Sequence, residues 1–143
     1  MSEYRIESPV KQIPYSQQRV YAKLSNLSYL GDYTDMLEDL PQDKVKIEEL
    51  HFDESSVSCS VSPIGKVELR IVERDDPKLV KYQATTSPIP LTLWAQILPT
   101  AVEACKIKLT LSTELNFFMK GMLQKPLKEG LDKIAEVLAS VPY

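Results

Sequence analysis

The chain has 143 residues, of which 43% are hydrophobic and 26% charged, as is ordinary for a soluble globular protein. Its formal net charge of −3 leaves no basic footprint, which argues against nucleic acid as a partner. No apolar run reaches the roughly 18 residues of a membrane-spanning helix, so stable membrane insertion is not expected. The length suits one domain over residues 1–143. The first residues show no signal-peptide pattern, so the expected location is the cytoplasm.

The inventory of reactive side chains is small. The chain has two cysteines, Cys59 and Cys105, and one histidine, His51. This is too little for a cluster of His and Cys ligands, so we expect neither a metal nor another cofactor. His51 stands between two inward-facing apolar residues and is expected to point to solvent.

The N-terminal third predicts one strand and two short helices. Residues 4–13 alternate weakly between polar and apolar and are expected to form a strand that Pro14 ends. Ser16 is a suitable N-cap for a helix over residues 17–24. A second helical patch, closed by Pro41, places Tyr33, Met36, Leu37 and Leu40 on one side.

The middle of the chain predicts a set of strands. From residue 45 to residue 112 the hydrophobic period changes from 3.6 to 2. Strands are expected at 46–52, 57–62, 67–71, 80–86, 91–97 and 105–112. Turns are expected at 63–65 and 74–77, a break in pairing at 87–90 and a loop at 99–103. Short connections imply antiparallel pairing with one buried face.

The C-terminal segment predicts a long amphipathic helix over residues 115–141, with Asn116 as its N-cap. Its apolar stripe comprises Met119, Met122, Leu123, Leu127, Leu131, Ile134, Val137, Leu138 and Val141. Pro126 lacks a backbone donor and is expected to kink or split this helix. Gly130 places no side chain on the line that faces the core. The helix is therefore expected to cover the sheet without filling all the space beneath it.

Two stretches carry a family resemblance: VYAKLSNLSYLGDY after the first strand and PLKEGLDKIAEVLASVP near the end. Together with the order of elements, they resemble the START-like superfamily, also called SRPBCC, and its small bacterial members in particular. The resemblance implies an α+β helix-grip fold, in which a curved antiparallel sheet of about seven strands surrounds a long C-terminal helix, with two short helices after the first strand. Members share a cavity between sheet and helix.

The resemblance also bears on the cysteines. The sheet order that it implies puts Cys59 and Cys105 four strands apart, roughly 19 Å at about 4.8 Å per strand. A disulfide requires Cα atoms within about 7 Å, so we expect two unpaired, slowly reacting thiols on inward faces.

The expected cavity combines inward strand positions with the covering helix. Its predicted lining is Leu37, Val57, Cys59, Val61, Leu69, Ile71, Tyr82, Leu93, Ile97, Leu109, Leu111, Phe118, Met119, Met122, Leu123, Pro126 and Gly130. Tyr82 is the one large hydrogen-bonding side chain at an inward strand position; it either orients a ligand or is a core tyrosine whose hydroxyl is satisfied locally. The aromatic and methionine residues at the start of the long helix form either a ligand mouth or ordinary core.

Three functions are consistent with these patterns. The first is a non-catalytic binding or carrier protein for a small hydrophobic ligand such as a lipid or isoprenoid. The second is an enzyme of the cyclase or aromatase kind, for which the inward positions offer only Tyr82 and Glu73. The third is a module that binds a protein partner, such as a chaperone, through the outer sheet face around Trp94. No catalytic residue is predicted.

Overall fold

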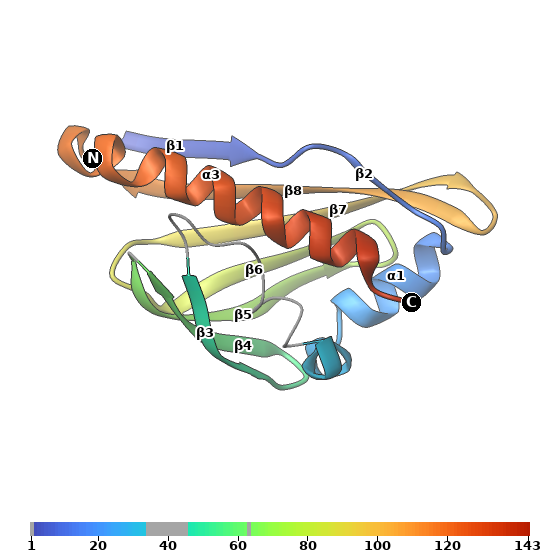
Figure 1. Ribbon diagram of the computed structural model, residues 1–143. Coiled ribbons are helices and arrows are strands. Elements are labelled where there is room, and N and C mark those ends of the chain that lie inside the picture. The colour runs from blue at the N-terminus through green and yellow to red at the C-terminus, as the bar shows by residue number, and fades with distance from the viewer. Residues whose placement is uncertain (1, 34–45, 63) are drawn as a thin grey trace.

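One curved antiparallel sheet wraps around a long C-terminal helix in the computed structural model, which describes residues 2–33, 46–62 and 64–143 (Figure 1). The strands are β1 Ser2–Glu7, β2 Lys11–Ile13, β3 Lys46–Phe52, β4 Ser56–Ser62, β5 Gly65–Asp75, β6 Leu79–Thr86, β7 Leu91–Ala101 and β8 Ala104–Leu115. The helices are α1 Gln17–Leu24, the 3₁₀ helix η1 Leu27–Tyr33 and α3 Phe117–Ser140. The predicted α+β helix-grip fold is confirmed.

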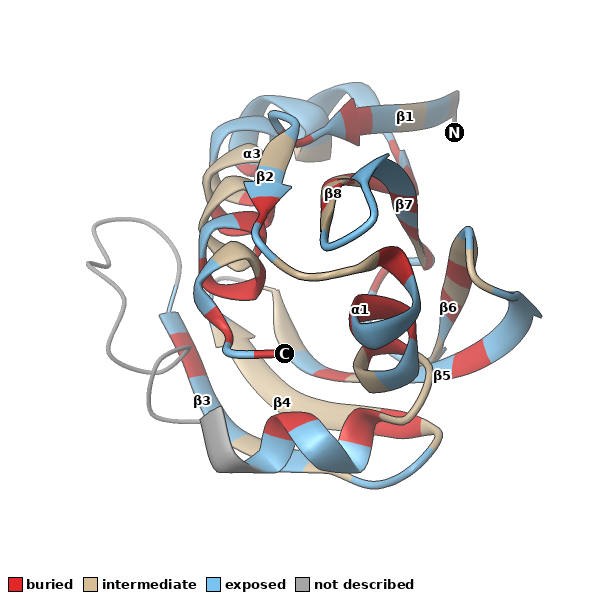
Figure 2. Ribbon diagram, turned by 90° about the vertical axis from the view of Figure 1, so that its right-hand side faces the viewer, coloured by how far each residue is buried: buried red, intermediate tan, exposed pale blue. Residues whose placement is uncertain are grey.

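The order of the strands explains how the sheet closes around the helices. Within the described residues the order is β1-β8-β7-β6-β5-β4-β3, and β2 is a second partner of β8. Figure 2 shows the sheet curling from β1 and β8 to β3 and β4, with α1 and α3 on its concave side. α3 packs on β8, β2 and β1, and α1 packs on β7. The far half of the sheet therefore faces α3 across the interior.

The predicted first strand is two strands, so the described part of the sheet has eight strands instead of about seven. The interruption lies at Ser8 and Pro9, because proline has no backbone N–H to donate. The Ser8 hydroxyl accepts a hydrogen bond from the backbone N–H of Leu109 at 2.9 Å, and the Ser8 N–H donates to the Leu109 carbonyl at 2.8 Å. A side chain thus bridges the gap in the ladder.

A further expectation about a connection was wrong. The loop predicted at 99–103 is a hairpin, in which β7 and β8 stay paired as far as Ala101 and Ala104. Pro99 is tolerated because the register shifts between Pro99 and Ala101, and such irregularities accommodate a residue without an N–H.

The second predicted helical patch is represented by η1. Its remaining predicted residues, including Leu37, lie outside the described residues.

Both predicted N-caps are confirmed. The Ser16 hydroxyl accepts a hydrogen bond from the Arg19 N–H at 3.3 Å, and the Asn116 side-chain oxygen accepts one from the Met119 N–H at 2.8 Å. Each bond satisfies a backbone donor in the first turn of a helix, which has no partner inside the helix.

α3 is not split at Pro126 but runs unbroken from Phe117 to Ser140. Pro126 has no N–H to donate to the Met122 carbonyl, so one bond of the helix ladder is missing there while the helix continues on both sides. The apolar stripe holds from Leu123 onward, whereas its assignment to Met122 was wrong.

The turn between β3 and β4 is organised by the carboxylate of Asp53. One carboxylate oxygen accepts hydrogen bonds from the N–H groups of Ser55 and Ser56 at 2.9 and 2.7 Å, and the other accepts one from the Ser56 hydroxyl at 2.8 Å. These bonds hold the pKa of Asp53 below its ordinary value of 3.8, and the bond from the Ser56 hydroxyl has the largest effect. The turn sets the pairing of Phe52 with Val57.

We expect Asp53→Asn to make stability less dependent on pH in the acid range. Because the pKa of Asp53 is lower in the folded chain, the unfolded chain binds more protons, and stability is lost as pH falls from about 4 through the folded pKa. Denaturant midpoints measured from pH 6 down to pH 2 would test this. Glu7 retains part of the effect in the variant, since Lys108 lowers its pKa in the same direction. Identical pH profiles for both proteins would contradict the role of Asp53.

Candidate ligand cavity

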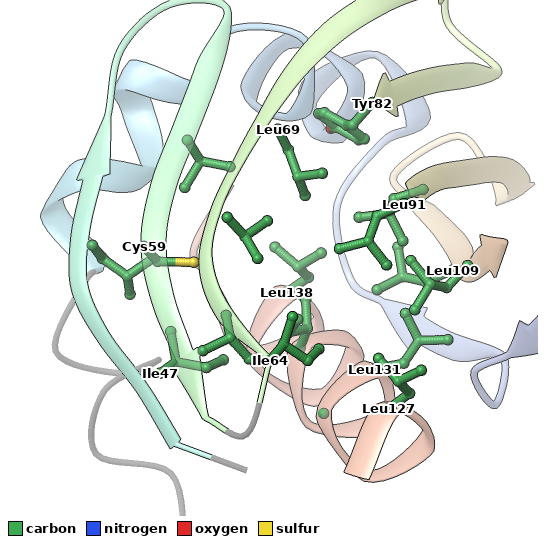
Figure 3. A pocket seen from close by; sticks show the side chains of 18 of the residues that line it. Ile47, Cys59, Ile64, Leu69, Tyr82, Leu91, Leu109, Leu127, Leu131 and Leu138 are labelled. Atoms are coloured by element: carbon green, nitrogen blue, oxygen red, sulfur yellow. The ribbon is translucent and has the colours of Figure 1, made fainter. Parts of the chain in front are cut away.

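A cavity of about 200 Å³ lies between α3, η1 and the concave face of the sheet (Figure 3). Its lining is Leu24, Leu27, Leu30, Ile47, Leu50, Phe52, Val57, Cys59, Val61, Ser62, Ile64, Val67, Leu69, Tyr82, Leu91, Leu93, Ala95, Leu109, Leu111, Pro126, Leu127, Gly130, Leu131, Ile134 and Leu138. None of these described residues carries a charged side chain. The space therefore suits an apolar molecule.

Pairing between neighbouring strands aligns the cavity-lining residues that the sheet contributes. Val57 of β4 pairs with Leu69 of β5, and Cys59 pairs with Val67. On the other side, Leu93 of β7 lies between Tyr82 of β6 and Leu111 of β8. Because directly opposed residues project from the same face of a sheet, these side chains form continuous rows.

Most of the residues predicted for the cavity do line it. They are Val57, Cys59, Val61, Leu69, Tyr82, Leu93, Leu109, Leu111, Pro126 and Gly130. Ile71, Ile97 and Leu123 are buried in the hydrophobic core but are not part of the wall. Ile97 lies where α1 packs on β7, and its carbonyl accepts a hydrogen bond from the Gln17 side chain at 2.8 Å.

The residues at the start of α3 lie away from the cavity. Phe118 is 74% exposed and Met122 is 58% exposed, while Met119 is half-buried, and none of the three is in the wall. Core packing is therefore wrong for Phe118 and Met122, whereas a ligand mouth stays a prediction. Figure 1 shows that the first turns of α3 extend past the strands that the helix covers.

Many wall residues were absent from the predicted lining, among them Phe52, Ser62, Val67, Leu91 and Ala95 of the sheet. Leu24, Leu27 and Leu30 come from α1 and η1, and their spacing of three matches a 3₁₀ turn, a signal present in the sequence. Ile64 lies in the turn before β5, where apolar residues have no periodicity to interpret. Leu127, Leu131, Ile134 and Leu138 belong to the predicted helix stripe, and the structure places them in the cavity wall as well.

A bulge in β3 adds Ile47 and Leu50 to the wall. The register with β4 shifts between Glu48 and His51, and Glu49 has a φ of 56°. With the extra residue, Ile47 and Leu50 both line the cavity although they are three positions apart. His51 is exposed, as predicted.

The Tyr82 hydroxyl is already engaged. It donates a hydrogen bond to the backbone carbonyl of Leu24 at 2.7 Å in a buried position, joining β6 to the end of α1. Burial raises the pKa of Tyr82 far above its ordinary value of 10, so the hydroxyl stays protonated. Tyr82 is therefore a core tyrosine with a satisfied hydroxyl, and only its ring contributes to the wall.

The described wall offers no acid–base pair. Glu73, the other group considered for catalysis, is exposed and lies outside the wall. Nor do any three His, Cys, Asp or Glu side chains gather as metal ligands in the part of the chain that the structure describes. Cys59 belongs to the described wall, and its sulfur points into the cavity in Figure 3.

We expect both thiols to react slowly with a water-soluble maleimide in the native protein. Cys59 and Cys105 are unpaired, burial raises the pKa of Cys59 to about 11, and burial also raises the pKa of Cys105. At pH 8 little thiolate is then present at either position. Labelling followed by mass spectrometry, with the urea-unfolded chain as the reference, measures both rates. Rapid native labelling of both residues would contradict the buried placement.

Two cationic side chains cover Trp94 on the outer face of the sheet. The Arg5 guanidinium lies 5.1 Å and the Lys81 ammonium 5.6 Å from the centre of the Trp94 ring, and Trp94 is half-buried. Cation–π contacts of this kind account for a tryptophan on a polar face without a protein partner.

Comparisons with solved structures agree with this architecture. Norcoclaurine synthase from Thalictrum flavum, as a point mutant with a transition-state analogue, superposes with a TM-score of 0.71 at 14% identity, covering 97% of this chain and 93% of that one. The Zhui aromatase/cyclase from Streptomyces sp. R1128 gives 0.67 at 15% identity, with 97% and 93% covered. A START superfamily protein from Mycobacterium smegmatis gives 0.54 at 10% identity, with 94% and 98% covered.

These likenesses show that the chain has the helix-grip fold of START-like proteins. At such identities they concern the fold alone. No protein-family model matches the sequence, and no curated protein sequence matches it either. Among the described residues, no helix has the length and apolar character needed to cross a bilayer.

Proposed function

We propose that this protein is a non-catalytic binding or carrier protein of the cytoplasm that holds a small, uncharged hydrophobic molecule between the sheet and α3. The observation that carries the proposal is a cavity of about 200 Å³ whose described lining has no charged side chain. An ionised group entering such a space would lose its hydration without gaining a partner, which favours neutral ligands.

The volume limits the size of the ligand. An apolar cavity of about 150 Å³ stays dry and takes up benzene, so a space somewhat larger suits one or two fused rings or a short branched hydrocarbon. Burying about 200 Å² of such a ligand contributes roughly 5 kcal/mol, which corresponds to a Kd on the order of 0.2 mM. A longer lipid or isoprenoid would have to leave part of its chain outside the cavity.

A cyclase or aromatase activity is supported less well. Two of the similar structures are a synthase and an aromatase/cyclase, and another structure of the synthase holds dopamine and hydroxybenzaldehyde. Proton transfer needs a titratable group within hydrogen-bond reach of the substrate. In the described wall the candidates are Tyr82 and Cys59. The Tyr82 hydroxyl is already hydrogen-bonded to the Leu24 carbonyl, and the pKa of Cys59 is raised.

The test compares two probes that differ in one charged group. Ligand-observed NMR would measure the binding of naphthalene and of 2-naphthoate to protein purified without detergent. We expect naphthalene to bind at least about tenfold more tightly, because the carboxylate finds no partner in the wall. Saturating naphthalene should also slow the maleimide labelling of Cys59 but not that of Cys105, which is outside the wall. Equal affinities, or no effect on Cys59, would overturn the proposal.

A further inference from the structure

The first two turns of α3 expose three large apolar side chains. Phe117 is 95% exposed, Phe118 is 74% exposed and Met122 is 58% exposed. Phe118 and Met122 are four residues apart and so share one face of the helix, and Gly121 beside them is also exposed. We call Phe117, Phe118, Gly121 and Met122 the apolar tip. None of its side chains is needed to close the core.

The charge around the apolar tip is positive although the chain as a whole is negative. Residues 116–128 contain Lys120, Lys125 and Lys128 and no acidic residue, in a chain of net charge −3. Lys128 is held by Asp132 at 2.9 Å, and Lys120 lies 5.2 Å from the Tyr4 ring. The exposed Lys125, three residues after Met122, extends the same face.

Neither the charge nor the apolar character of this segment is explained by helix stability. The positive end of the helix dipole favours acidic residues in the first turn, and α3 has none there. Among the described residues, Glu114 precedes this segment and pairs with Glu3 across β1 and β8, and Glu129 follows it and lines a surface pocket with Lys125 and Lys128. Glu3 and Glu114 alternate with Tyr4 and Leu115, which contact the helix side or the core, so these two carboxylates project from the opposite face of the sheet.

The small area of the apolar tip favours a lipid surface over a protein partner. An aromatic side chain buries at most about 150–250 Å², so two phenylalanines and one methionine supply roughly 500 Å². A stable protein interface needs about 800 Å² from each partner. A bilayer sets no such minimum, because each apolar side chain that enters the headgroup boundary adds its own contribution.

We propose that the apolar tip docks on an anionic lipid surface. Phe117, Phe118 and Met122 enter the boundary between headgroups and acyl chains, and Lys125 lies against the headgroup phosphates. Pro126 and Gly130 of the cavity wall follow in the next turns of the same helix, so docking brings this side of the cavity close to the bilayer. This interaction does not depend on what the cavity holds.

Vesicle sedimentation tests the proposal. The wild-type chain is expected to bind vesicles of equimolar phosphatidylcholine and phosphatidylglycerol more tightly than vesicles of phosphatidylcholine alone. The double variant Phe117→Ser, Phe118→Ser should bind the mixed vesicles at least about tenfold more weakly, and Lys125→Gln about fivefold more weakly. Both variants change exposed positions, so circular dichroism and the melting temperature should stay as in the wild type.

The matched control is Val102→Ser, which removes another exposed apolar side chain, 86% exposed, in the β7–β8 hairpin. It should leave vesicle binding unchanged. Absence of wild-type binding to the mixed vesicles, or equal binding of the double variant, would overturn the proposal. So would a wild-type dimer in sedimentation velocity that the double variant dissociates, since the apolar tip would then contact a second copy of the chain.

Discussion

Replacing Leu131 by Ala is expected to lower the free energy of unfolding by about 2–5 kcal/mol, the usual cost of truncating a buried leucine. Leu131 is 3% exposed on the face of α3 that looks onto the cavity and the sheet. The truncation removes apolar contacts and enlarges a space that is already unfilled, and the surrounding strands are held in register by ladder pairing. The interior can therefore collapse only in part.

The matched control is Met122→Ala on the same helix. Met122 is 58% exposed, so its truncation and that of His51 should stay within about 0.5 kcal/mol of the wild type. Urea denaturation followed by circular dichroism measures all three variants, and unchanged slopes would show that only stability has changed. Similar midpoints for Leu131→Ala and Met122→Ala would mean that α3 does not cover the core in the way described.

Replacing Gly130 by Leu is expected to abolish naphthalene binding. Gly130 is buried and forms part of the cavity wall, so a leucine side chain at this position would occupy the space that the ligand needs. Leucine also favours the helix over glycine by about 0.5–1 kcal/mol, so the variant should be at least as stable as the wild type.

Gly121→Leu provides the control for this variant. Gly121 lies on the same helix, and a Cβ added there would meet no atom within 4 Å. The control should gain the same helix propensity and bind naphthalene as the wild type does. If Gly130→Leu were instead less stable by about 1–3 kcal/mol, as in an overpacked core, the leucine would not fit the cavity. Full naphthalene binding by Gly130→Leu would place the probe elsewhere on the protein.

Local sequence patterns predicted the elements well where one face of each element is buried. The alternation of Val57, Cys59 and Val61 placed β4 and its inward face, and the cap residue Asn116 placed the start of α3. These signals depend on neighbouring residues and on a buried side, which a sequence records directly. The same reasoning missed the β3 bulge, because Ile47 and Leu50 do not have the spacing of a regular strand.

The sequence by itself determined the periods of the strands and helices and both N-caps. It also determined that the inward faces carry almost no charged residue, and the interior is apolar for this reason. Only the tertiary structure decided which inward residues surround empty space. Ile97 and Leu93 are both inward on β7, yet α1 packs where Ile97 lies while the cavity opens beside Leu93. The exposure of Phe118 was decided in the same way, because α3 begins past the edge of the surface that it covers. Periodicity specifies the side of an element on which a residue lies, but burial also requires a second element opposite it, and that depends on how the whole chain is packed.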